Sequence, residues 1–330
     1  MNYLTNSELK PYGSVGTSSA RARALVAHQR AQWSVASNNY ASLSRVDTRT
    51  FRFGGTTILC QHNPERIRSS DAKTDGASIA ARPCFLCVDN RPIEQSVIPF
   101  GRGYAVLCNP FPIFPEHLTL PSHLHKDQRI SGKIPVFLNA LKGFSDFVVF
   151  YNGPATGASA PDHFHFQAGS KGVLPLEGEL EQLPGAVTLP LCETDATQIF
   201  TAENALRRML VFRGSNPAGL ARTLRRTIGL LPKPSQGSEP MLNLLGWHNA
   251  KGYTVVLFPR SVQRPYQYFA TGDDRLLVSP ATVELGGLVV LPRKEDFLKI
   301  TNEDLRSIFE QVTLNGVDFT QLTQRILSWK

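Results

Sequence analysis

Three polar side chains stand at alternate positions in one short stretch of the chain, namely His163, His165 and Gln167. Alternate side chains of a β-strand point to the same face, so these three would share a face while Phe164 and Phe166 pack into a core. A neutral imidazole attacks phosphorus near neutral pH, and an amide N–H can donate to a phosphate oxygen. The stretch therefore predicts phosphate transfer with His165 as the nucleophile. The alternative is a histidine pair that only packs or binds metal.

A loop of small residues comes just before this stretch. Its sequence is Tyr-Asn-Gly-Pro-Ala-Thr-Gly-Ala-Ser over residues 151–159. Glycines let backbone N–H groups meet an anion, and two of the loop residues add polar side chains. We expect the substrate phosphate to be bound by Asn152, Gly157, Ser159 and Gln167.

A pair of cysteines, Cys84 and Cys87, has the Cys-x-x-Cys spacing of metal and redox sites. The chain has five cysteines, an odd number, which favours reduced thiols over a disulfide framework. A tetrahedral zinc would need two more ligands, for which His123 and His163 are candidates, and four protein ligands would make it structural. Two histidines could replace His123, namely His117 and His125. A metal-free pair of buried thiols is the other reading, and nothing in the sequence indicates magnesium.

The elements that must position these residues follow from the apolar pattern. In the first half, it predicts a helix over Ser18–Tyr40, a hairpin over Thr50–Cys60, a helix from Ile134 to Asp146, and strands at Tyr104–Cys108, His117–Leu120 and Phe147–Tyr151. In the second half, it predicts helices at Thr201–Phe212, Pro217–Leu230 and Asp304–Val312, and strands at Tyr253–Phe258, Arg275–Ser279 and Gly286–Leu291. The polar segment Asn63–Ala81 is expected to be a surface loop, or a lid over a phosphate.

The two halves show a weak internal echo. The strand pair of the first half, which ends in Pro121-Ser122-His123, resembles Tyr253–Phe258 followed by Leu288–Leu291, which ends in Pro292. Such an echo is typical of an old duplication, although two similar strand endings also arise by chance. We expect a helical extension over 1–50, a catalytic half over 51–190 and a second half over 191–330 that lacks the histidine pair.

Composition limits the class of protein. The chain has 330 residues and 42% hydrophobic residues, enough for a large core. It has no run of 18 apolar residues and no apolar signal segment at its start, so we expect a cytoplasmic protein with no membrane partner. The net charge of +8 favours anionic partners. Aromatic residues are not interleaved with the basic ones as in a base-stacking surface, which argues against nucleic acid.

Together these motifs resemble the transferase branch of the histidine-triad (HIT) superfamily. This branch includes galactose-1-phosphate uridylyltransferase, diadenosine tetraphosphate phosphorylase and GDP-galactose phosphorylase, and its signature His-x-His-x-Gln corresponds to residues 163–167. The loop 151–159, the Asn-Pro-Phe-Pro sequence at 109–112 and the strand ending at His123 match as well. Residues 82–87, Arg-Pro-Cys-Phe-Leu-Cys, also resemble an uncharacterised bacterial family.

The resemblance implies an α+β fold of two HIT-like halves, with antiparallel sheets flanked by helices. It implies that His165 carries a nucleotidyl group as a covalent intermediate, that Gln167 contacts the reacting phosphate, and that a structural zinc is bound by Cys84, Cys87, His123 and His163. The donor would be a dinucleoside polyphosphate or a nucleoside-diphosphate sugar, and the acceptor phosphate or a sugar 1-phosphate. A homodimer would be in keeping with the family. The alternatives are a zinc-stapled nucleotide- or nucleic-acid-binding protein without catalysis, and a nucleotide hydrolase.

Overall fold

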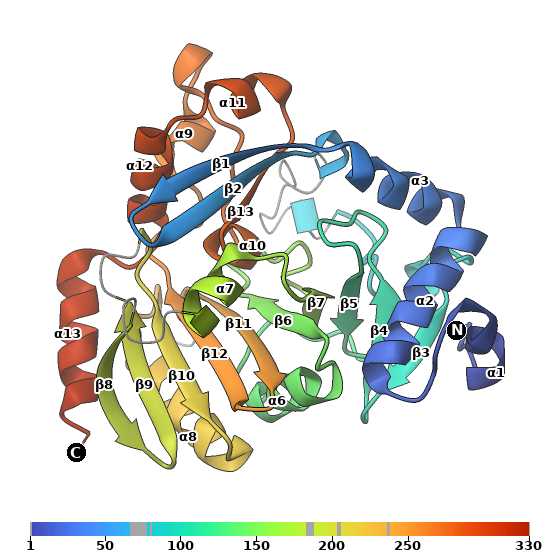
Figure 1. The fold of residues 1–330 in the computed structure, drawn as a ribbon, viewed down its shortest axis with the longest axis horizontal. Helices are drawn as coiled ribbons and strands as arrows, with labels where there is room; N and C mark the ends of the chain where they lie inside the picture. Colours follow the sequence, from blue (N-terminus) through green and yellow to red (C-terminus); the bar gives the residue numbers. More distant parts are fainter. Residues whose placement is uncertain are drawn as a thin grey trace.

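A ten-stranded antiparallel sheet forms the centre of the molecule in the computed structural model, which describes residues 2–66, 78–79, 81–182, 188–202, 206–235 and 238–329 (Figure 1). Most of the predicted phosphate lid, residues 67–77 and 80, lies outside the described residues. The first five strands are β3 (Val97–Phe100), β4 (Tyr104–Cys108), β5 (His117–Pro121), β6 (Phe147–Asn152) and β7 (His165–Ser170). The next five are β8 (Thr188–Thr194), β9 (Thr197–Ala202), β10 (Leu210–Gly214), β11 (Leu242–Asn249) and β12 (Gly252–Pro259).

The two sets of five strands have the same topology. The sheet order is β3-β4-β5-β7-β6-β11-β12-β10-β9-β8, so each half repeats one order and the halves meet where β6 pairs with β11. A helix lies between the third and fourth strand of each half, α6 (Ile134–Gly143) in the first and α8 (Pro217–Ile228) in the second. This confirms the predicted α+β class with tandem antiparallel halves. The domain boundaries themselves stay a prediction.

The predicted echo matched the wrong strands. β13 (Leu288–Leu291) belongs to a separate three-stranded sheet with β1 (Asp47–Phe53) and β2 (Thr56–His62), where it pairs in parallel with β2. By order and pairing, the counterpart of β5 is β10. The prediction relied on similar sequences at the ends of strands. The repeat is defined by the order in which the strands pair, and a short motif does not encode that order.

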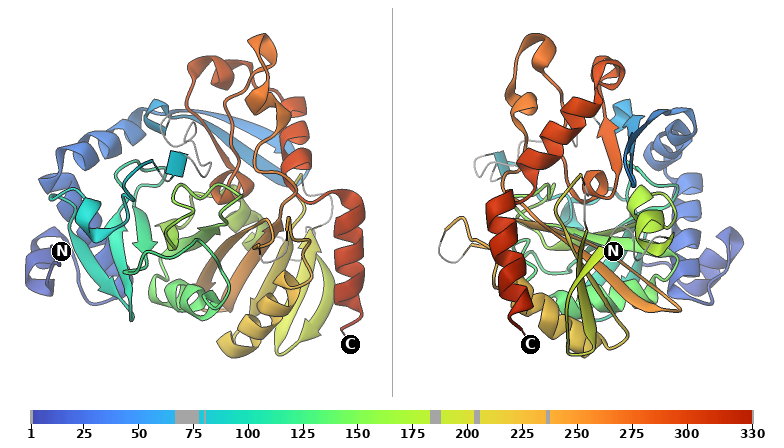
Figure 2. Two further views of the ribbon diagram at one scale, coloured as in Figure 1. Left: turned by 180° about the vertical axis from the view of Figure 1, so that it is seen from behind. Right: turned by 60° about the vertical axis from the view of Figure 1, so that its left-hand side comes forward.

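The large sheet is covered on both faces. Helices α6 and α8 pack on one face, and the small sheet with α10 (Thr282–Leu285) and α12 (Asn302–Val312) lies over the other (Figures 1 and 2). On β7, Phe166 packs against Phe137 of α6, with ring centroids 5.4 Å apart. Because side chains alternate, His165 and Gln167 point to the opposite face, towards the small sheet. The aromatic anchors expected for this strand therefore set its orientation.

The other α-helices of the described residues are α1 (Asn6–Leu9), α2 (Ser18–Gln32), α3 (Ser34–Ser42), α7 (Pro175–Gln182), α9 (Tyr266–Phe269), α11 (Lys294–Lys299) and α13 (Gly316–Leu327). Of these, α2 packs over β3, β4 and β5 on the face that α6 also covers. None of the helices among the described residues is long and apolar enough to span a bilayer. The predicted helix over Ser18–Tyr40 is two helices, because Trp33 between them is extended, with φ −128° and ψ 108°. Trp33 is 6% exposed, so packing of the indole outweighs helix continuity.

Two predicted elements of the second half are wrong. The expected helix Thr201–Phe212 contains the end of β9 and part of β10, where Leu210 and Phe212 face one core and Val211 the other. In the turn before β10, Arg207 is 1% exposed, and its Nη2 lies 3.5 Å from Glu179 Oε2. The expected strand Arg275–Ser279 has no ladder partner among the described residues. The other predicted strands and helices are present, with ends shifted by a few residues.

Candidate active site

A cavity of about 940 Å³ opens between the large sheet and the elements that cover it. Its floor is a row of residues in register across four strands, Leu107 of β4, Thr119 of β5, Gln167 of β7 and Phe150 of β6. Neighbouring strands lie about 4.8 Å apart, so this row is about 14 Å long. Gln167 stands in the middle of it, and His165 lies on the same face of β7 two residues before.

The imidazole of His165 has a defined tautomer. Its Nδ1 lies 2.8 Å from the carbonyl oxygen of His163. A carbonyl can only accept, so Nδ1 carries the proton and Nε2 keeps its lone pair. Burial lowers the pKa of His165 to about 4, which keeps the ring neutral near neutral pH. His165 is 2% exposed and lines the cavity, so the side chain expected to be the nucleophile lies in a cavity with one nitrogen lone pair available.

Gln128, which the sequence did not indicate, holds the backbone on which this histidine stands. Its Oε1 accepts from the N–H of His165 at 2.8 Å, and its Nε2 donates to the carbonyls of His165 and Asn152, each at 2.9 Å. The β6–β7 ladder ends at Phe150 and Gln167. The Gln128 side chain therefore supplies hydrogen bonds where backbone pairing between β6 and β7 stops, and it fixes the two chain segments where they separate.

The amide of Gln167 is oriented by His117. The N–H of Ile113 donates to His117 Nδ1 at 3.2 Å, so the proton of the neutral ring is on Nε2, which lies 3.0 Å from Gln167 Oε1. Burial, assisted by the Arg66 charge, lowers the pKa of His117 to about 3. Because Oε1 accepts from this neutral donor, the amide NH₂ of Gln167 is left for the cavity. His117 is thus tied to Gln167 rather than to the cysteines.

The small-residue loop forms one wall of the cavity. Gly157 has φ +103°, and a Cβ on it would come 2.6 Å from the Cβ of Ala281 in the second half, so glycine is required there. Ser159 lines the cavity, and neither its hydroxyl nor its N–H bonds to a described residue. Asn152 also lines the cavity, and its Oδ1 accepts from Asn243 at 2.9 Å and from both the N–H and the hydroxyl of Thr282. These three bonds fix the Asn152 amide with its NH₂ as the remaining donor.

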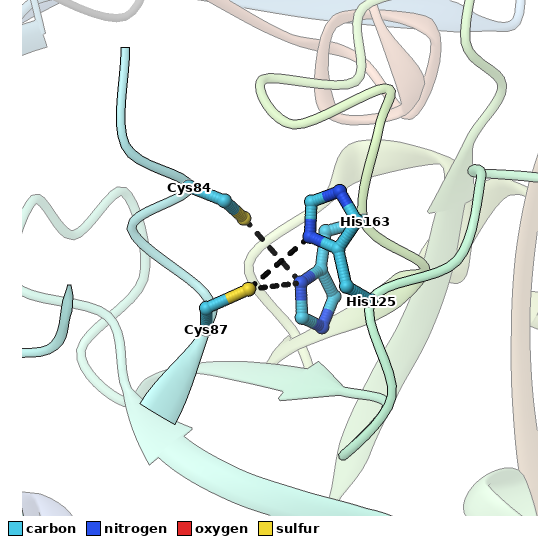
Figure 3. A group of neighbouring side chains, drawn as sticks. All are labelled: Cys84, Cys87, His125 and His163. Atoms are coloured by element: carbon cyan, nitrogen blue, oxygen red, sulfur yellow. Dashed lines mark hydrogen bonds between the residues drawn. The ribbon is translucent and has the colours of Figure 1, made fainter. Parts of the chain in front are cut away.

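Four side chains next to the cavity could hold a metal ion (Figure 3). They are Cys84, Cys87, His125 and His163, whose ligand atoms all lie within 4.8 Å of one another. The Nδ1 of His163 is 3.3 Å from Cys84 Sγ and 3.5 Å from Cys87 Sγ, and the Nδ1 of His125 is 3.1 Å from Cys87 Sγ. Tetrahedral zinc with ordinary bond lengths would separate sulfur and nitrogen by about 3.5 Å. His163 Nε2 donates to the Ser122 carbonyl at 2.8 Å, which leaves Nδ1 unprotonated, as a metal ligand must be.

The ligand set expected from the sequence needs one correction. His123 lies outside this group, and its Nε2 is 3.2 Å from the hydroxyl of Tyr3. His125 takes its place, because the chain after β5 turns back so that Lys126 accepts from the N–H of Phe164 and brings its preceding residue beside the cysteines. The two cysteines and His163 lie together as expected.

The second half of the chain completes the cavity. Its residues in the wall are Gln263, Arg264, Ser279, Ala281, Val283, Glu284 and Val290. Glu284 is 9% exposed, and burial raises its pKa. The positive charges of Arg66 and Arg260 offset only part of this rise. The first half adds apolar residues to the lining, among them Trp33, Val35, Leu86, Pro110 and Phe111.

Comparisons with known proteins agree with this architecture. A family model for a GDPGP1-like C-terminal domain matches residues 195–329, and a domain of unknown function (DUF4922) matches residues 25–170. Yeast Ap4A phosphorylase Apa2 in complex with Ap4A has a similar structure, with a TM-score of 0.58 and 18% identity over 88% of this chain and 97% of that chain. The structure of the same enzyme without a named ligand gives a TM-score of 0.54 and 16% identity over 85% and 94% of the two chains. No curated protein sequence matches the chain significantly.

The fold of the chain is thus HIT-like and has two halves, as the resemblance implied. The two family models divide the chain in a similar place to the repeat in the sheet. The signature at residues 163–167 lies in the first matched region, and part of the cavity wall comes from the second. The second half thus matches the model of a GDPGP1-like C-terminal domain, and the chain shares the fold of yeast Ap4A phosphorylase, in keeping with the resemblance to the transferase branch of the HIT superfamily.

Proposed function

We propose that this protein is a nucleotidyltransferase of the phosphorylase type that acts through a nucleotidyl group on His165. The observation that carries the proposal is the hydrogen bond from His165 Nδ1 to the His163 carbonyl, since it leaves the Nε2 lone pair in the cavity. The similarity of the fold to a yeast enzyme whose structures contain Ap4A and AMP supports a nucleotide substrate.

In the proposed first step, Nε2 of His165 attacks the α-phosphorus of the donor. A P–N bond forms, the bond from phosphorus to the bridging oxygen breaks, and its electron pair leaves on the phosphate of the departing group. In the second step, an oxygen of the acceptor phosphate attacks the same phosphorus, and the P–N bond breaks. The donor is a dinucleoside polyphosphate or a nucleoside-diphosphate sugar, and the acceptor is phosphate or a sugar 1-phosphate.

The other cavity residues support this role. Several neutral groups can donate hydrogen bonds to phosphate oxygens without acting as acids. They are the NH₂ groups of Gln167 and Asn152, the Ser159 hydroxyl and the backbone N–H of Gly157. A zinc ion bound by Cys84, Cys87, His125 and His163 would be structural, since four protein ligands leave no place for a reactive water. Its role would be to join the cysteine segment, residues 84–87, to the chain just before β7.

The test uses donors labelled at the α-phosphate, including Ap4A, GDP-sugars and UDP-sugars, each incubated without an acceptor. We expect label on the wild-type protein and none on His165→Ala, with His248→Ala as a control for a histidine away from the cavity. Adding phosphate should release the label as a nucleoside diphosphate, whereas a hydrolase would release a nucleoside monophosphate with or without phosphate. If no donor labels the wild-type protein, or if His165→Ala labels equally, the proposal fails.

A further inference from the structure

Arg82 stands between the two parts of the site just described. It precedes the cysteine segment by two residues, and its guanidinium group lines the cavity. One of its terminal nitrogens, Nη2, donates to the carbonyl oxygen of Ser159 at 3.1 Å, in the phosphate-facing loop. The guanidinium carbon lies 5.0 Å from the ring centroid of Phe85, which covers one face of the group.

The other terminal nitrogen of Arg82, Nη1, is buried and has no hydrogen-bond partner among the described residues. A buried N–H without an acceptor costs free energy, so such a group in a cavity wall indicates an acceptor that comes with a ligand. Asp162 forms an ion pair with the other terminal nitrogen, since its Oδ1 lies 3.6 Å from Nη2, which is too long for a hydrogen bond, and its Oδ2 faces His125 Nε2 at 3.7 Å. This ion pair leaves Nη1 without a hydrogen bond to a described residue.

The chemistry of the group points to phosphate. A guanidinium is always charged, and its planar fork matches the oxygens of a phosphate. The residue whose carbonyl accepts from Nη2, Ser159, also offers a hydroxyl and an N–H that bond to no described residue. These donors line the same cavity as His165.

We propose that Arg82 binds the phosphate chain of the nucleotide through Nη1 while Nη2 holds the Ser159 carbonyl. This inference deepens the proposed function and rests on it. The cysteine segment then has a role beyond stability, since it places a cation against the loop that faces the substrate.

The experiment compares the zinc-loaded full-length wild type with Arg82→Gln and Arg82→Lys by titration calorimetry. The probes are ADP, GDP and UDP and the three matching nucleosides. Arg102→Gln is the matched control, because Arg102 is exposed and lies in the turn before β4. Zinc content and melting temperature are measured for each variant, so that a loss of metal or fold is recognised.

We expect Arg82→Gln to bind the preferred diphosphate at least tenfold more weakly, with nucleoside affinity changed less than twofold. Arg82→Lys should keep part of the diphosphate affinity, since a lysine retains the charge but cannot hold the phosphate and the Ser159 carbonyl together. Equal diphosphate affinity in the wild type and Arg82→Gln overturns the inference. So does equal weakening by Lys and Gln, which would mean that Arg82 only anchors the loop. If the wild type binds none of the probes, the proposed function itself fails.

Discussion

The buried side chain of Gln128 gives the sharpest prediction about how the site is built. It is 1% exposed and makes three hydrogen bonds, to the N–H and C=O of His165 and to the C=O of Asn152. Gln128→Leu keeps most of the volume and removes all three bonds. Each buried backbone group left without a partner costs about 1–3 kcal/mol. Because the strand ends can relax towards water, we expect a loss of about 3–5 kcal/mol in the free energy of unfolding.

A domain of this kind has about 5–15 kcal/mol of stability, so we expect the variant to be folded at 25 °C. Turnover should fall much more than substrate affinity, because a shift of about 1 Å in a reacting group can cost about 100-fold in rate. Gln128→Glu separates the bonds, since a carboxylate can still accept from the His165 N–H but cannot donate to the two carbonyls. Because the buried carboxylate faces two carbonyl oxygens without a donor, we expect its stability at neutral pH to be no higher than that of Gln128→Leu.

The assay combines urea unfolding with the rate at which His165 takes up label. Gln321→Leu on α13 is the control for the same substitution at an exposed position. A Gln128→Leu protein that loses less than about 1 kcal/mol, against the cost expected for unpaired buried groups, and that labels at the wild-type rate would refute the reasoning.

Further predictions follow from single contacts. His125→Ala should lose bound zinc by elemental analysis while His123→Ala keeps it, and the reverse result would restore the ligand set expected from the sequence. Gly157→Ala should lower the free energy of unfolding by about 1–3 kcal/mol for the strained backbone, and more for its clash with Ala281; a neutral effect in urea unfolding would contradict this. Burial lowers the pKa of His117 to about 3 in the folded state, against about 6.5 when unfolded. Below pH 6.5 the unfolded chain binds the extra proton, so between pH 6.5 and 5 the wild type should lose about 2 kcal/mol more stability than His117→Gln, and equal pH slopes for the two proteins would count against it.

The residues proposed to do the chemistry could be predicted because their spacing follows the period of a strand. His165 and Gln167 share a face of β7 as alternation requires, and Phe166 on the other face packs against α6. His163 lies just before the strand, and its imidazole joins the cysteines rather than the cavity. Local pattern was enough here, since the phenylalanines leave only one way to orient the strand.

Other parts of the site could not be predicted, because they depend on irregular chain paths. His123 and His125 are two residues apart in a loop without regular structure, so only the tertiary path decides which one meets the cysteines. The side chain of Gln128 bonds to backbone groups 24 and 37 residues away, for which its sequence neighbours give no signal. The misassigned helix at Thr201–Phe212 shows the same limit, since pairing with β12 outweighs local helix propensity there.

The proposed reaction depends on a single covalent bond, between phosphorus and the Nε2 of His165. The most direct measurement is mass spectrometry of the wild-type protein, quenched under mildly alkaline conditions after mixing with a donor and no acceptor, and then digested. We expect the peptide that contains residues 163–167 to gain the mass of one nucleoside monophosphate, with fragmentation placing it on His165. A nucleotidyl group on another residue, or turnover of the donor without any modified peptide, would contradict the account.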